Sequence, residues 1–197
     1  MIFESGAQAR EDVKVSNTGD ENIFVQVEVL EVRKPGTIDE EKVTVSDPSK
    51  LKLIATPNKL IVPPGAQKLV RIVSLKPADA EEHVYRINVT PILPPLEEEA
   101  SQLRIVVAYQ ILTIVQAAKP KSNLEVVRTA KSITFHNKGN SNVLLSDGRQ
   151  CEMEDKCQEL NSKRIYAGNS WTLDLPFDAP VAYSVRSFDG VKKEVYQ

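Results

Sequence analysis

The chain has 197 residues, of which 41% are hydrophobic and 26% charged, a composition typical of a folded protein with one large core or two smaller ones. Its formal net charge of −2 gives no overall field that would favour nucleic acid or a membrane surface. No apolar run reaches the roughly 18 residues of a spanning helix, and no basic-then-apolar signal peptide follows Met1.

Most of the first part of the chain consists of short segments rich in Val and Ile, in which apolar residues alternate with polar ones. An alternation with a period of two predicts β-strands. Turn residues separate the segments, for example at 16–20 and 63–65. The predicted strands cover residues 13–15, 23–32, 51–55, 60–62, 67–75, 83–92 and 103–115.

A second set of alternating segments follows the Pro- and Lys-containing stretch at 119–122. Its predicted strands cover residues 124–127, 132–136, 142–145, 170–175, 181–187 and 191–196. Turn signals spaced about 8–12 residues apart are typical of β-sandwiches and barrels. The sequence therefore predicts an all-β protein with two modules, near residues 1–118 and 121–197.

The segment at 103–115 carries the most informative pattern. Apolar side chains recur there at every second position, and the intervening positions are mixed. An apolar strand of this kind is costly to leave at a sheet edge, because its unpaired backbone groups recruit other chains. It is therefore either buried or kept available for the backbone of a partner. The alternating residues are Leu103, Ile105, Val107, Tyr109 and Ile111.

The two cysteines, Cys151 and Cys157, flank a strongly polar run. A metal site would need about four ligands, and His83 and His136 show no ligand spacing relative to the cysteines. A disulfide is the favoured interpretation, with two free thiols as the main alternative. It would stabilise the fold by about 2–2.5 kcal/mol and would indicate an oxidising compartment. The chain would then be a mature or trimmed form, since no signal peptide precedes it.

The sequence predicts no enzyme. It contains neither a Gly-x-Ser-x-Gly motif nor a Gly-rich phosphate loop. His83 and His136 fall in predicted strands, where they are expected to be packing or surface residues. We therefore expect no catalytic residue, metal site, cofactor or nucleic-acid partner.

In order along the chain, several motifs resemble the periplasmic pilus-assembly chaperones of the PapD-like superfamily. Residues 2–6 resemble the first strand of that family and its turn, and residues 56–65 resemble its Pro-Pro-Gly segment. Residues 83–87, with Pro94 and Pro95 after them, resemble the sixth strand and its loop, and 134–140 resemble a turn of the second domain. The cysteine pair resembles the alternate-chaperone branch that serves class 5 and common-pilus-type fimbriae.

The resemblance implies two immunoglobulin-like β-sandwiches set at an angle, with the Cys151–Cys157 disulfide in the second domain. It also implies a chaperone that binds pilin subunits in the periplasm. Donor-strand complementation would proceed through strand G1, the segment 103–115, with Leu103, Ile105, Val107, Tyr109 and Ile111 entering the pilin. An outer-membrane usher-type platform would receive the subunits. The sequence leaves open whether the unloaded chaperone caps its own edge as a homodimer.

Two alternatives use the same fold without chaperone activity. In the first, the chain is a structural or adhesive surface protein and the segment 103–111 is buried. In the second, it is a regulatory or secretion-associated binding module with a partner other than pilin. The sequence does not separate the possible partners, because the pockets that receive the side chains belong to the client.

Overall fold

The structure is a computed structural model that describes residues 1–3, 10–75, 79–92, 107–153 and 155–197. Within these residues the regular structure consists of β-strands and one short 3-10 turn, η1 (Pro48–Lys50). The all-β class predicted from the sequence is thereby confirmed. None of the described segments forms an apolar helix of membrane-spanning length.

The chain folds into two compact units that are not two consecutive stretches of sequence. The first unit comprises Met1–Arg33, Glu41–Pro77 and His83–Val115, and the second comprises Lys34–Glu40, Ala78–Glu82 and Gln116–Gln197. Two short insertions of the N-terminal half thus belong to the second unit. The domain limits of 1–118 and 121–197 stay a prediction.

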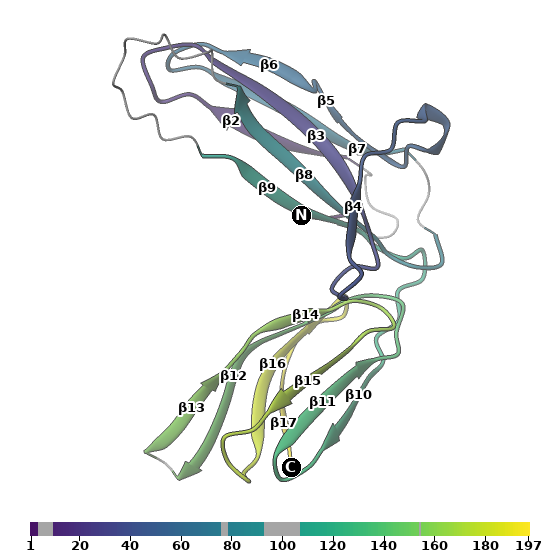
Figure 1. The fold of residues 1–197 in the computed structure, drawn as a ribbon, viewed down its shortest axis with the longest axis vertical. Coiled ribbons are helices and arrows are strands. Elements are labelled where there is room, and N and C mark those ends of the chain that lie inside the picture. The colour runs from purple at the N-terminus through teal and green to yellow at the C-terminus, as the bar shows by residue number, and fades with distance from the viewer. Residues whose placement is uncertain (4–9, 76–78, 93–106, 154) are drawn as a thin grey trace. The chain divides into compact units, whose positions relative to one another are not determined.

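The first unit is a sandwich of two sheets (Figure 1). One sheet has the strand order β1-β9-β8-β3-β4, with β6 also paired to β3, and the other has the order β2-β7-β5. All pairings are antiparallel except that of β1 with β9. The strands are β1 (Ile2–Phe3), β2 (Arg10–Ser16), β3 (Ile23–Arg33), β4 (Glu41–Val43), β5 (Leu53–Thr56), β6 (Lys59–Val62), β7 (Gln67–Ser74), β8 (His83–Ile92) and β9 (Tyr109–Val115).

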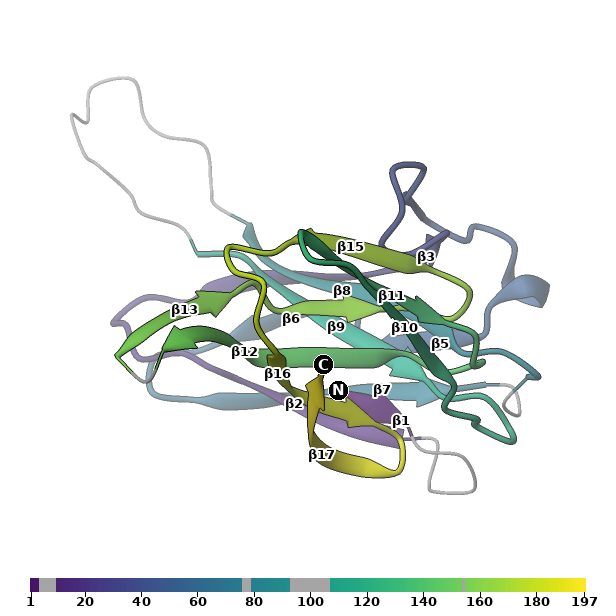
Figure 2. The same cartoon turned by 90° about the horizontal axis from the view of Figure 1, so that it is seen from below.

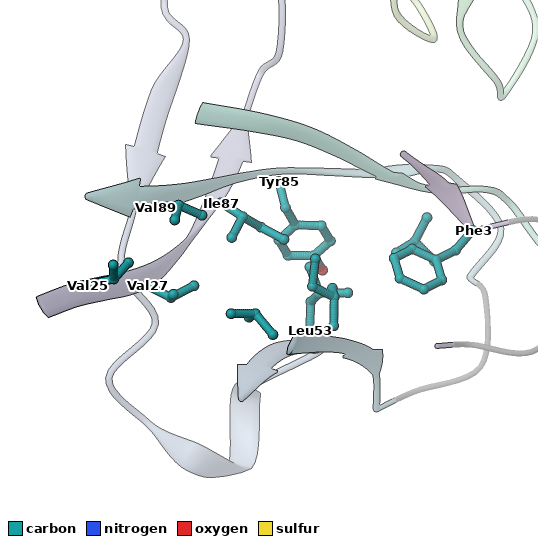
Figure 3. Packing of buried hydrophobic residues seen from close by; sticks show 10 residues of the cluster. Phe3, Val25, Val27, Leu53, Tyr85, Ile87 and Val89 are labelled. Carbon is teal, nitrogen blue, oxygen red and sulfur yellow. The ribbon is translucent and has the colours of Figure 1, made fainter. Parts of the chain in front are cut away.

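The core of this unit follows from the alternation of its strands. On β3, Val25 and Val27 are buried while Gln26 between them is exposed, as the two-residue period requires. They pack with Ile87 and Val89 of β8 and with residues of the facing sheet. Figure 3 shows these side chains converging with Leu53 between the layers. The inner face of the sheet that contains β8 and β9 is thereby defined.

The second unit is also a two-sheet sandwich. One sheet has the order β10-β11-β15, and the other has the order β13-β12-β16-β17, with β14 paired to β12. An aromatic cluster fills its core, in which Phe135 stacks on Trp171 and meets Tyr183 edge to face. The strands are β10 (Leu124–Arg128), β11 (Ser132–Asn137), β12 (Val143–Met153), β13 (Lys156–Leu160), β14 (Lys163–Ile165), β15 (Ser170–Asp174), β16 (Val181–Ser187) and β17 (Gly190–Tyr196).

The predicted strand at 142–145 is longer in the structure. It continues as β12 through Gly148 and Cys151 to Met153, and returns as β13, a strand that the sequence did not predict. Figure 2 shows β12 and β13 side by side as a two-stranded ribbon. The ribbon residues from Cys151 onward are half-buried or exposed, so no alternation of buried and exposed side chains marks it in the sequence.

Candidate functional site

Strand β9 lies near one edge of its sheet. It pairs with β8 along its whole length, from Val89–Tyr109 to His83–Val115. On its other side, β1 pairs only with Ile114 and Val115. In the part of the chain that the structure describes, no strand pairs with residues 109–113 on that side, so β9 presents an open edge there.

The backbone groups available at this edge can be identified from the contacts of β1. Ile114 donates its N–H to the Met1 carbonyl, and Leu112 O accepts a hydrogen bond from the Met1 amino group. Backbone groups of successive strand residues point to opposite sides. Gln110, two residues before Leu112, therefore also directs its N–H and C=O toward the open edge. An added strand would find donors and acceptors there.

Apolar side chains of β9 lie beside this edge on the inner face of the sheet. Tyr109 is 65% exposed although it pairs with buried Val89, and Val107, just before the strand, is 53% exposed. Ile111, opposite Ile87, is half-buried and contacts the core. The described part of the predicted apolar row thus runs from the core outward to solvent.

Two of the predicted donor residues, Leu103 and Ile105, lie outside the described residues. The predicted strand 103–115 is also shorter within the described part, where it begins at Tyr109 rather than including Val107 and Ala108. The structure therefore brings Val107, Tyr109 and Ile111 to one edge. Their role in binding a partner stays a prediction at this point.

The outer face of the same sheet carries polar residues that the sequence analysis did not single out. Gln110 Nε2 donates to Asn88 Oδ1 at 2.8 Å across β8 and β9. One pair further along, Arg86 faces Leu112 on β9 and Leu30 on β3. In the sequence, Arg86 stands out only as a charged residue within the largely apolar predicted strand 83–92.

The predicted disulfide is present in the structure, where it joins Cys151 and Cys157. These residues face each other across β12 and β13, so the bond ties the two strands of the ribbon together. Next to it, the buried Gln150 donates from Nε2 to the carbonyls of Phe177 and Ala179. The ribbon is thereby connected to the loop before β16.

Both histidines lie in strands, as the sequence predicted. His136 Nδ1 lies 2.7 Å from Oγ of Ser170, an exposed residue on the neighbouring strand β15. His83 Nε2 lies 3.2 Å from Lys52 Nζ. Among the described residues, no group of His, Cys, Asp and Glu side chains is arranged to hold a metal ion.

Comparison with known proteins places these features among fimbrial proteins. Residues 1–120 match the family described as "Pili and flagellar-assembly chaperone, PapD N-terminal domain". The chain is 26% identical over 194 residues to a CFA/I fimbrial protein of Escherichia coli, covering 92% of this chain and 81% of that protein. It is 27% identical over 172 residues to a CS1 fimbrial protein of the same organism, covering 81% and 71%.

Solved structures show the same fold at lower identity. The class 5 fimbriae chaperone CfaA matches with a TM-score of 0.72 and 22% identity, covering 100% of this chain and 95% of that one. The SafB chaperone of Salmonella enterica, solved with the SafA pilin, matches with a TM-score of 0.65 and 18% identity, covering 99% and 91%. The CsuC chaperone of Acinetobacter baumannii, solved with the tip subunit CsuE, matches with a TM-score of 0.64 and 15% identity, covering 99% and 93%.

Proposed function

This chain belongs to the family of pili and flagellar-assembly chaperones with a PapD N-terminal domain, and from this premise we propose that it binds fimbrial subunits through the open edge of β9. It is a chaperone of pilus assembly. Relatives solved with a pilin or a tip subunit support fimbrial subunits as its clients. The client would be a subunit that lacks one strand of its own sandwich.

The observation that carries this proposal is the combination of an unpaired backbone edge and exposed apolar side chains on β9. An incomplete subunit would form main-chain hydrogen bonds with this edge, and its groove would receive Val107 and Tyr109. Each fully buried side chain of this size contributes roughly 1.5–3 kcal/mol before the costs of association are subtracted. The backbone would supply register, and the side chains would supply affinity.

We propose that Leu103 and Ile105 extend the same row toward the N-terminal end of the lent segment, because they continue the two-residue spacing of Val107 and Tyr109. Ile111 would then be the innermost member, shared between the client and the chaperone core. Under this proposal residues 1–118 carry client binding and residues 121–197 form the second immunoglobulin-like domain. No catalytic step and no cofactor enter the mechanism.

The periplasm is the compartment in which we propose that the chaperone works. Its Cys151–Cys157 bond supports this, because disulfides persist in oxidising compartments. An usher-type platform in the outer membrane would take the loaded chaperone and exchange β9 for a strand of the next subunit. That exchange would supply the free energy for release, so the cycle needs no nucleotide.

The test is co-expression of this chain with the pilin encoded beside its gene, followed by size-exclusion chromatography. We expect wild type to yield a one-to-one complex. The double variant Val107→Asp/Tyr109→Asp should stay folded and yield none, because it places two carboxylates in the client groove. Leu69→Asp is the matched control, since Leu69 is 52% exposed on β7 of the other sheet of the same unit.

Two results would remove the proposal. If the double variant binds the pilin as wild type does, the β9 edge is not the binding site. If wild type itself forms no complex, the alternative of a structural or adhesive protein with the same fold takes precedence. Circular dichroism of the variants separates loss of binding from loss of folding.

A further inference from the structure

The outer face of one sheet of the second unit, the sheet that contains β12, β16 and β17, carries three cations. The buried residues of β16 alternate with Ala182, Ser184 and Arg186, which therefore face outward. Lys193 of β17 pairs with Ser184, and Arg149 of β12 pairs with Ala182. Because residues paired across strands share a face of the sheet, the three cations lie together on the outer face.

These three cations are exposed and have no carboxylate partner. None of them forms an ion pair or a side-chain hydrogen bond among the residues that the structure describes. Other cations of the chain are paired, as Arg71 is with Asp12 and Arg128 is with Asp178. The cations of this face thus remain available to an anionic group outside the chain.

Short side chains separate the cations. Ser146, Ser184 and Lys193 form one row across β12, β16 and β17. Ala182 lies beside Arg149 in another row. Serine and alanine leave room above the middle of the face, so the longer cationic side chains around them can converge on a phosphate-sized group placed there.

Two exposed valines flank Lys193 along β17. Val191 is 56% exposed and Val195 is 59% exposed, and the two-residue period places both on the same face as Lys193. Val191 also pairs with Arg186. Cations interspersed with exposed apolar side chains are typical of protein surfaces that lie in the headgroup region of a bilayer.

The charges of the second unit are divided between its two outer faces. The acidic neighbours of this face, Glu159 opposite Arg149 and Asp147 at the bulge of β12, lie toward β13 and away from the valines. On the other sheet, the outward positions of β10, β11 and β15 include Glu125 and Asp174 and no lysine or arginine. This asymmetry would orient the unit in front of an anionic surface.

We propose that this outer face, with Arg149, Arg186, Lys193, Val191 and Val195, binds the surface of a bilayer that contains anionic phospholipid. The cations meet the lipid phosphates, and the valines enter the interface beside them. The chain as a whole has a net charge of −2, so the attraction is confined to this face and is sensitive to salt.

A bilayer fits this face better than an acidic protein does. The cores of protein interfaces are built around aromatic anchors and are depleted in lysine. Here the outward positions of β12, β16 and β17 carry no aromatic side chain, and the apolar residues are scattered among cations. The inference goes beyond the proposed function, because it concerns the second unit, whereas client binding uses β9 of the first.

The experiment is co-sedimentation of the full chain with vesicles of phosphatidylcholine alone, or of phosphatidylcholine with about one third phosphatidylglycerol, at about 0.05 M and about 0.5 M salt. Each basic residue at an anionic surface strengthens attachment about fivefold. Wild type should therefore bind the anionic vesicles at least tenfold more tightly than the neutral ones at low salt, and lose this preference at high salt.

The variant Arg186→Glu/Lys193→Glu should bind the anionic vesicles at least tenfold more weakly than wild type. The matched control is Lys131→Glu/Lys138→Glu, which makes the same change of charge at exposed positions on either side of β11 in the other sheet. It should bind within about threefold of wild type. Arg186→Gln/Lys193→Gln, which only neutralises the cations, keeps the test informative if circular dichroism shows that the Glu variant is unfolded.

Three results would overturn the proposal: no preference of wild type for anionic vesicles, equal binding by wild type and the folded Glu variant, or equal losses in that variant and the control. If wild type ignores the vesicles but binds polyglutamate through Arg186 and Lys193, the partner is an acidic protein and the bilayer is excluded. Complex formation with the pilin should be the same in all these variants. Failure of wild type to bind the pilin would remove the proposed function and leave the vesicle result standing.

Discussion

Asn17 and Asn137 occupy equivalent places in the two sandwiches and make the same three hydrogen bonds. Asn17 Nδ2 donates to the carbonyls of Glu21 and Val62, and its Oδ1 accepts from the N–H of Gly19. Asn137 Nδ2 donates to the carbonyls of Ser141 and Ile165, and its Oδ1 accepts from the N–H of Gly139. Each side chain closes the turn that follows its strand and holds a second strand in place.

Replacing either asparagine with alanine should destabilise the chaperone by about 2–4 kcal/mol, because two backbone carbonyls lose their donor at a buried position. Urea unfolding monitored by circular dichroism measures this loss. Asn→Asp at the same position is the informative companion, since it keeps the acceptor for the glycine N–H and removes both donors. Equal stability of wild type and Asn137→Ala would contradict the assignment.

Replacing Thr113 should stabilise the chaperone, whereas replacing either asparagine should destabilise it. Thr113 is fully buried on β9, and its Oγ1 has no hydrogen-bond partner in the described part of the chain. Thr113→Val keeps the shape and removes a hydroxyl whose burial costs about 1–3 kcal/mol. We expect a gain of about 1 kcal/mol, or roughly 2–4 °C in Tm, with client binding unchanged. A lower Tm in the variant would show that the hydroxyl has an acceptor in solution.

Glu82 should make stability depend on pH. Burial raises the pKa of the Glu82 carboxyl, and hydrogen bonds from Asn142 oppose this rise only in part. Because the folded state then holds the proton more tightly than the unfolded chain, the free energy of unfolding should fall as pH rises from about 4.5, the unfolded value, through the raised folded pKa.

Glu82→Gln tests this directly. Its amide oxygen can still accept both hydrogen bonds that Asn142 donates to Glu82 Oε2, but it carries no charge. The variant should gain stability relative to wild type as pH increases from 4 to 7, as measured by urea unfolding at each pH. Parallel stability curves for the two proteins over this range would show that Glu82 does not titrate in the folded state above its unfolded value.

The Cys151–Cys157 bond should stabilise the chaperone by about 2–2.5 kcal/mol through the short loop that it closes. The double variant Cys151→Ser/Cys157→Ser is expected to lose this amount in urea unfolding, and wild type in reductant should lose the same amount. A reductant that also weakens the double variant would mean that the effect does not come from this bond. A thiol assay of the unreduced protein, which should find no free thiol, is the accompanying check.

The sequence was sufficient to predict the strands that have one buried face and one exposed face. The limits predicted for 83–92 are those of β8, because buried and exposed side chains alternate along it. The ribbon strand β13 was missed because the residues that follow Cys151 are half-buried or exposed, and β4 was missed because it has only three residues. Alternation of apolar and polar residues arises when one face of a strand is buried, so it does not identify a strand in which neither face is buried.

The candidate site could also be predicted only in part from the sequence. The alternation at 103–115 predicted Val107, Tyr109 and Ile111, which the structure brings to one edge because Val107 directly precedes β9 and the other two lie on it. It could not identify the contact between Gln110 and Asn88 on the outer face, since that contact depends on which residue of β8 pairs with Gln110. Such a register is fixed by the packing of the whole sheet, and the local sequence around Gln110 does not contain it.

The division of the chain between the two units limits where the chain can be divided into fragments. Gly36 approaches the ring of Tyr166 so closely that an added Cβ would lie 2.9 Å from it, and Glu82 accepts hydrogen bonds from Asn142. A fragment that stops near residue 118 keeps Gly36 and Glu82 but loses both partners, and a fragment that starts at 121 keeps the partners without them. A cut between 118 and 121 therefore separates segments of the second unit from one another, and a ribosome must synthesise most of the chain before that unit can close.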